Sequence, residues 1–474
     1  MRSISLLLAA GALLGPAAAA AQTAAELSPG LAHFVEVADP VVALTNVRVV
    51  DGTGAPPRDG QTIVIRDGRI AAVGPAASVD IPAGARTLDL RGHTVIPGLV
   101  GLHNHTFYTT SQRRVQITET APRLYLASGV TTIRTTGSYH PYSELNLRRA
   151  IQAGRAVGPR MYVTGPYITG GASSYMTSVD SPEDARRVVA YWAEEGVDWM
   201  KAYATISRAA LGAAIEEAHA RGIKVTAHLC SVTYREAVAL GIDNLEHGLF
   251  ANSDYVDDKR PDVCPSNLQA SFLDLDMQSE EVQQTFRDMI ENEVPMTTTL
   301  AIYELYVPGR PDPIDPRTLE AMAPEVRDEY LKTRQQILEG AAQSNYAQVF
   351  RKAMDYEVAF VRAGGLLGAG VDPTGYGGAL PGFGDQRNYE LLIEAGFTPV
   401  EAIRILTYNG ARILGEDDEF GSIEPGKRAD LVVIDGDPIA RPVEIRNVVT
   451  VFRDGVGYDP DALIESVRGA VGIR

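Results

Sequence analysis

Residues 96–108, IPGLVGLHNHTFY, join an apolar run to two histidines that are separated by a single asparagine. The run from Ile96 to Leu102 is typical of a buried strand. Alternate side chains of a strand point to the same face, so His103 and His105 are expected to project into one space. The chain has only eight histidines. One His-x-His pair can still arise by chance, and the rest of the sequence decides whether this pair is functional.

Seven further apolar segments follow, and helix-like segments separate them. Ser181, for example, is a suitable N-cap for a helix over residues 182–196. Strands and helices that alternate in this number predict an α/β fold, a (β/α)8 TIM-like barrel over residues 95–414. The eight expected strands cover residues 95–103, 129–136, 159–165, 197–203, 223–229, 242–248, 294–301 and 364–373.

Short strand-like segments with turns lie on both flanks of the expected barrel. Asp67-Gly68 separates two apolar runs and is typical of a hairpin turn. Residues 420–438 and 447–458 have the same character near the end of the chain. We expect residues 40–94 and 415–460 to form one small β-sandwich domain that is built from both termini.

Residues 1–21 have the composition of a secretory signal peptide. Arg2 precedes a short apolar core and an alanine-rich stretch that ends at Ala21. The alternative, a membrane anchor, needs about 20 apolar residues, and this core is shorter. Since no later stretch is apolar enough to span a membrane, we expect an exported protein that resides in the periplasm.

Composition limits the partners of this chain. Of its 474 residues, 45% are hydrophobic and 22% are charged, and the net charge is −17. The sequence contains no basic stripe, which argues against nucleic acid and anionic membranes as partners. A small-molecule substrate is expected, and assembly of several copies of the chain is left open. Cys230 and Cys264 are the two cysteines, and the sequence allows either a disulfide or two free thiols.

Polar side chains gather at the ends of five of the expected strands, where the active sites of such barrels lie. Neutral imidazole binds zinc and related divalent metals, and an aspartate can bind metal or accept a proton. A protonated lysine repels metal, so it can join such a site only after neutralisation or modification, for example as a carbamate formed with carbon dioxide. The six residues are His103, His105, Lys201, His228, His247 and Asp372.

This set resembles the amidohydrolase superfamily in its two-metal form, and the phrases PGLVGLHNH and GSIEPGKRADLVVID add to the resemblance. The overall sequence is similar to imidazolonepropionase-related and Xaa-Pro-dipeptidase-like members. The resemblance implies that His103, His105 and Asp372 hold one ion and that His228 and His247 hold a second. Carboxylated Lys201 would bridge the two ions. Zinc is the default metal, with manganese, cobalt or iron as alternatives.

The resemblance implies that a hydroxide between the metals attacks a small substrate and that Asp372 carries its proton to the leaving amine. We expect cleavage of an amide or peptide-like C–N bond of a dipeptide or an N-acyl amino acid. His140 and Tyr203 are candidate substrate contacts. The alternatives are a deaminase, a lactone or ester hydrolase, or a binding protein without catalysis. Against a deaminase, Ser231 stands where that branch has a glutamate.

Two connections are unusually long, residues 251–295 and 303–364. Long loops at the ends of barrel strands often carry binding residues, but an insertion without a role in binding is the alternative.

Overall fold

The computed structural model describes residues 27–473, and the predicted signal peptide, residues 1–21, lies outside them. Its central feature is a parallel sheet that closes into a ring. The pairing order runs from β11 (Arg160–Tyr162) to β12 (Thr164–Thr169), with the two-residue strand β13 (Thr177–Ser178) paired outside β12. Only Val163 separates β11 and β12 in the chain, so together they fill one position of the ring. The chain is therefore an α/β protein with a TIM-type barrel, as the sequence predicts.

Each of the eight expected strand segments contributes one position of this ring. The positions are β7 (Leu99–Asn104), β10 (Val130–Thr135), β11 (Arg160–Tyr162) with β12 (Thr164–Thr169), β14 (Trp199–Ala202), β15 (Lys224–Ala227), β16 (Asn244–Glu246), β17 (Met296–Thr298) and β18 (Leu367–Ala369). Nearly all their residues are buried, as is usual for parallel strands that are covered on both faces. At Gly370, a Cβ would lie only 2.2 Å from the His103 backbone nitrogen, so closure of β18 against β7 requires a glycine.

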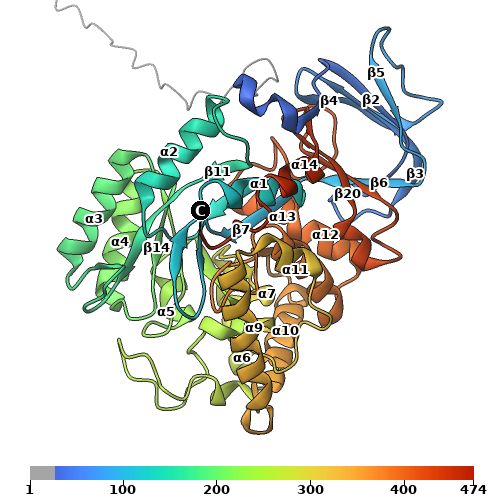
Figure 1. The fold of residues 1–474 in the computed structure, drawn as a ribbon. Coiled ribbons are helices and arrows are strands. Elements are labelled where there is room, and N and C mark those ends of the chain that lie inside the picture. Colours follow the sequence, from blue (N-terminus) through green and yellow to red (C-terminus); the bar gives the residue numbers. More distant parts are fainter. Residues whose placement is uncertain (1–26, 474) are drawn as a thin grey trace, which may run out of the picture.

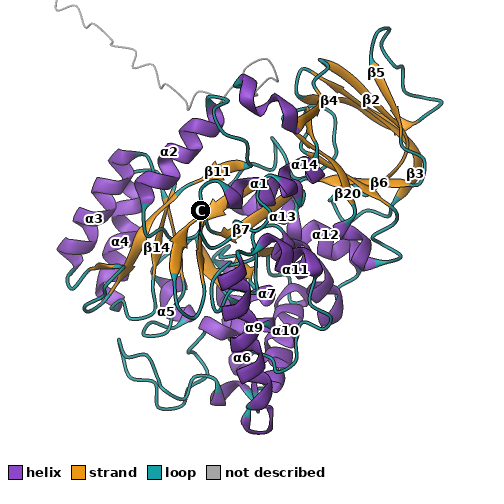
Figure 2. Cartoon of the chain, in the orientation of Figure 1, coloured by secondary structure: helices purple, strands orange, loops and turns teal. Residues whose placement is uncertain are grey.

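Helices surround the ring and bury its outer face. Figure 2 shows them as a purple layer outside the orange strands. Ser181 caps α3 as expected, because its side chain accepts a hydrogen bond from the Asp184 amide. The helices between or after barrel strands include α2 (Pro141–Gln152), α3 (Pro182–Glu195), α4 (Arg208–Ala220), α5 (Tyr234–Ala239), α6 (Glu280–Glu291) and α11 (Phe383–Ala395).

A second sheet of nine strands is built from both ends of the chain and packs beside the barrel (Figure 1). Its middle joins the two parts of the sequence, since β6 (His93–Pro97) pairs with β19 (Leu431–Asp435). Residues 95–97 therefore belong to this sheet, and the barrel begins at Leu99. The sheet has an apolar core of its own. Its other strands are β1 (Val35–Val37), β2 (Val41–Val49), β3 (Arg58–Arg66), β4 (Arg69–Pro75), β5 (Arg86–Asp89), β20 (Val448–Arg453) and β21 (Val456–Tyr458).

The long connection after β17 folds largely into helices, whereas the one after β16 is mostly irregular before it reaches α6 (Figure 1). The connection after β17 carries α7 (Leu300–Glu304), α8 (Pro316–Ala321), α9 (Pro324–Glu339) and α10 (Tyr346–Arg362). Within residues 27–473, no helix combines the length and the apolar character that crossing a membrane requires.

The two cysteines are paired in a disulfide, which resolves the alternative that the sequence leaves open. Cys230 follows β15, and Cys264 lies in the connection that follows β16, 34 positions later in the chain. The bond therefore attaches this connection to the end of a barrel strand.

Candidate metal centre

The six residues singled out from the sequence meet at the carboxyl ends of the barrel strands. His103, Lys201, His228, His247 and Asp372 all line one cavity of about 500 Å³. His105 lies beside them, with its Nε2 atom 3.3 Å from Asp372 Oδ1. Each residue reaches this place because a parallel strand ends there, so the barrel brings together groups that are far apart in the sequence.

The ligand atoms of His103, His105 and Asp372 all lie within 4.8 Å of one another. The His103 Nε2 atom is 3.7 Å from Asp372 Oδ2. Two nitrogens and one carboxylate at this spacing are a suitable donor set for a divalent metal.

The other two histidines continue this group. The His247 ring lies 4.4 Å from the His103 ring and 4.4 Å from the His228 ring, measured between centroids. Burial lowers the pKa of His228 to about 4 and also lowers those of His103 and His247. These three imidazoles are therefore neutral near pH 7, and the neutral form is the one that binds metal.

Lys201 is the most unusual member of the set. Its side chain is fully buried, and its Nζ atom forms no hydrogen bond with any residue in the range 27–473. Burial lowers the pKa of Lys201 to about 8. A buried amine without a partner is costly, since desolvation disfavours its charged form. Conversion to a carbamate would replace this amine with an anionic oxygen donor, so the residues present fit a two-metal centre.

Glu246 supports His103 through a hydrogen bond, and sequence reasoning missed it. Its carboxylate accepts hydrogen bonds from His103 Nδ1 at 2.8 Å, Arg134 Nη2 at 2.5 Å and Asn244 Nδ2 at 2.9 Å. The Thr226 hydroxyl also donates to it. The first bond fixes the His103 ring so that Nε2 faces Asp372. A glutamate directly before His247, at the end of a segment expected to be a buried strand, was the available signal.

Two of the six residues have left-handed backbone conformations. His247 has φ 69° and Asp372 has φ 48°, a region that is uncommon for residues other than glycine, although histidine and aspartate enter it more readily than most. Hydrogen bonds hold both in place, from the Asp372 amide to the His103 carbonyl at 2.7 Å and between His247 Nδ1 and Thr299 Oγ1 at 2.7 Å. Such conformations persist when the surrounding structure enforces them.

The two predicted substrate contacts have different outcomes. Tyr203 lines the cavity, with its ring centroid 4.8 Å from that of His228. His140 is exposed at the start of α2 and is not among the residues that line the cavity, so its contact with substrate stays a prediction. The chain turns into the helix at this point, so its neighbour Tyr139 faces the cavity instead. Further tyrosines complete the wall, namely Tyr167, Tyr175, Tyr303 and Tyr306.

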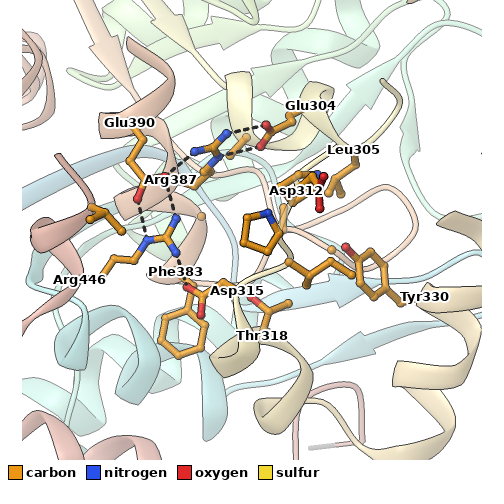
Figure 3. Close-up of a pocket in the computed structure, with 18 residues that line it drawn as sticks. Glu304, Leu305, Asp312, Asp315, Thr318, Tyr330, Phe383, Arg387, Glu390 and Arg446 are labelled. Atoms are coloured by element: carbon orange, nitrogen blue, oxygen red, sulfur yellow. Dashed lines mark hydrogen bonds and ion pairs between the residues drawn. The ribbon is translucent and has the colours of Figure 1, made fainter. Parts of the chain in front are cut away.

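A second cavity of about 260 Å³ lies beside α7, α8 and α11 and contains none of the six residues. Figure 3 shows that Arg387 and Arg446 pair with acidic side chains of the same cavity, whereas no interaction is drawn for Asp312. Arg387 contacts both Glu304 and Glu390, and Arg446 contacts Glu390. Because its arginines are paired with carboxylates and its lining contains no histidine, this cavity is not the candidate site.

The comparisons with known proteins agree with this geometry. A profile of the amidohydrolase family matches residues 94–259 and 367–456, more than half of the chain. A dihydroorotase from Anaeromyxobacter dehalogenans (strain 2CP-C) is 31% identical over 195 residues, 40% of this chain and 41% of that protein. The chain thus spans about two fifths of the length of the curated dihydroorotases that it matches. An imidazolonepropionase from Porphyromonas gingivalis is 59% identical over only 39 residues, 8% of this chain and 9% of that protein.

Solved structures match over a larger share. A putative prolidase from Bifidobacterium longum has a TM-score of 0.63 and 28% identity, over 90% of this chain and 98% of that one. A Xaa-Pro dipeptidase with methionine bound in its active site has a TM-score of 0.67 at 21% identity, over 88% and 100% of the two chains, which supports the fold alone. Together with the profile match and the ligand geometry, these findings lead to one conclusion: the chain belongs to the amidohydrolase family.

Proposed function

We propose that this protein is an exported, metal-dependent hydrolase that cleaves an amide or peptide-like C–N bond of a small substrate, a dipeptide or an N-acyl amino acid. The observation that carries the proposal is the buried, unpartnered Lys201 amine beside the histidines and Asp372. The disulfide supports export, since such bonds persist in oxidising compartments. The prolidase and dipeptidase structures support the substrate class.

His103, His105 and Asp372 would hold one ion, His228 and His247 a second, and carboxylated Lys201 would link them. When bound, such a pair of ions polarises a carbonyl and makes water nucleophilic near neutral pH. The Asp372 carboxylate would take a proton from the attacking water and pass it to the leaving nitrogen. Burial acts to raise the pKa of Asp372, but the contact with His103 and the hydrogen bond with His105 lower it overall.

Tyr203 would donate its hydroxyl to the substrate carbonyl. Burial raises the pKa of Tyr203, so the hydroxyl keeps its proton and can donate. Ser231 stands where the deaminase branch has a glutamate. Its hydroxyl donates a hydrogen bond to the Ile206 carbonyl at 2.6 Å, in the loop after β14, which argues against deamination.

The test is metal analysis of the purified protein, together with a hydrolysis screen of dipeptides and N-acyl amino acids. We expect about two metal ions per chain and amide cleavage in the wild type. We expect Lys201→Ala to lose both. Lys224→Ala is the matched control, because Lys224 is a partly buried lysine on the adjacent strand that does not line the cavity. Lys201→Ala with two bound metals and full turnover would contradict the bridging role.

A further inference from the structure

The mouth of the metal-site cavity carries an arginine whose charge is not neutralised. Arg114 lies in β9 (Arg114–Gln116), which pairs with β8 (Phe107–Thr109) in a hairpin directly after His105. Among residues 27–473, no carboxylate forms an ion pair with Arg114, although it lines the cavity. Its neighbour Arg113 lines the same cavity but is paired with Glu329 of α9. Apart from the six candidate metal-site residues, Arg114 is therefore the one unpaired charge in the described cavity wall.

Aromatic rings hold the guanidinium in place. Its Cζ atom lies 3.9 Å from the Tyr175 ring centroid and 4.4 Å from that of Tyr139. These two rings meet at 80°, so the guanidinium sits in the corner between them. Contacts of this kind position an arginine without neutralising its charge, and its N–H groups can still bind an anion.

A chain of ring contacts connects this corner to the metal site. Tyr139 packs on Phe107, with 4.2 Å between centroids, and Phe107 stacks on His105 at 4.3 Å. The hairpin is also attached to the loop after β18, because the Tyr108 hydroxyl donates to the Gly377 carbonyl at 2.6 Å. The position of Arg114 relative to the candidate ligands is thus set before any substrate arrives.

We propose that Arg114 binds a carboxylate of the substrate, so that the site selects amides bearing a free carboxylate at the end remote from the metals. The inference rests on the proposed function and adds a specificity-determining residue to it. Guanidinium and carboxylate have matching geometry and form strong charge-assisted hydrogen bonds. The chain has a net charge of −17, which repels anions, so an anionic substrate needs a local positive group at the entrance.

The test compares two ligands that differ only in the carboxylate, N-benzoyl-L-phenylalanine and N-(2-phenylethyl)benzamide. Binding to the purified, metal-loaded protein is measured by calorimetry, and hydrolysis of each compound is followed separately. We expect the acid to bind about 10- to 100-fold more tightly than the neutral amide, the range for hydrogen bonds to charged groups. The preference is expected to fall as salt rises, because the arginine is exposed.

Variants separate recognition from structure. We expect Arg114→Gln to reduce the ratio of the affinities for the acid and the neutral amide to about 1. The affinity for the neutral amide itself should change by less than about threefold. Arg114→Lys should keep part of the preference for the acid. Arg113→Gln is the matched control and keeps the preference, since Arg113 is already paired with Glu329. If Arg114 had only a structural role, its replacement would weaken the binding of both ligands equally.

The outcomes distinguish this inference from the proposed function. Equal binding of acid and neutral amide to the wild type, or no detectable binding of either, overturns the role of Arg114. Hydrolysis of both without preference leaves the proposed function in place and removes the inference. A carboxylate preference in binding, without hydrolysis of either compound, supports the role of Arg114 and contradicts the proposed function.

Discussion

Removal of the Glu246 carboxylate should weaken both the fold and metal binding. The Glu246 and Arg134 side chains are 0% exposed and form an ion pair at 2.5 Å. Glu246→Ala therefore leaves a buried guanidinium without its counter-charge, which costs about 3–5 kcal/mol. An unfolding entropy of about 2.1 cal/mol/K per residue gives this chain about 1 kcal/mol per degree, so the melting temperature should fall by about 3–5 °C.

The same substitution releases the Nδ1 atom of His103, which Glu246 holds at 2.8 Å. Loss of such a supporting contact lowers metal affinity about 10- to 100-fold. Scanning calorimetry measures the first effect, and metal titration of chelator-treated protein measures the second.

Two variants show whether the two effects have separate causes. Arg134→Met with Glu246→Leu removes both charges and should recover most of the stability but not the metal affinity. Asp430→Ala breaks another buried pair, with Arg160 at 2.7 Å, and should lower stability alone. An unchanged melting temperature and metal affinity in Glu246→Ala would refute the reasoning.

Two further predictions concern stability. Replacement of Cys230 and Cys264 by alanine removes the cross-link across a separation of 34 residues. The free energy of unfolding, measured with urea under oxidising conditions, should fall by about 4 kcal/mol. As a check, reduction should cause the same loss in the wild type and no further loss in the variant. Burial raises the pKa of Glu357 from 4.5 to about 8. The unfolded chain then binds fewer protons than the folded one between these values, so this group's stabilising contribution is complete below pH 4.5 and is lost as the pH rises toward 8. Glu357→Gln should flatten this decline in melting temperature, and an equally steep decline in the variant would disprove it.

Local patterns were sufficient for the elements of the fold. The apolar runs predict all eight barrel positions, and Ser181 predicts the start of α3, because strand burial and helix capping are properties of a few neighbouring residues. The candidate ligands also followed from position, since a polar group at the end of a parallel strand lies at the active-site face of a barrel. The boundary at Val95 was less predictable, because β6 and β7 are separated only by Gly98 and both read as buried strand.

The sequence by itself determined the barrel, the candidate metal ligands and the amidohydrolase resemblance. Only the tertiary structure decided that Cys230 pairs with Cys264 and that Glu246, itself paired with Arg134, supports His103. It also decided that Tyr139 rather than His140 faces the cavity and that, among residues 27–473, no carboxylate pairs with Arg114. The physical reason is that these properties depend on distances between segments far apart in the chain. The elements that pack against a residue determine its burial, its partners and whether its charge is neutralised. Local sequence patterns do not encode the distances between such elements.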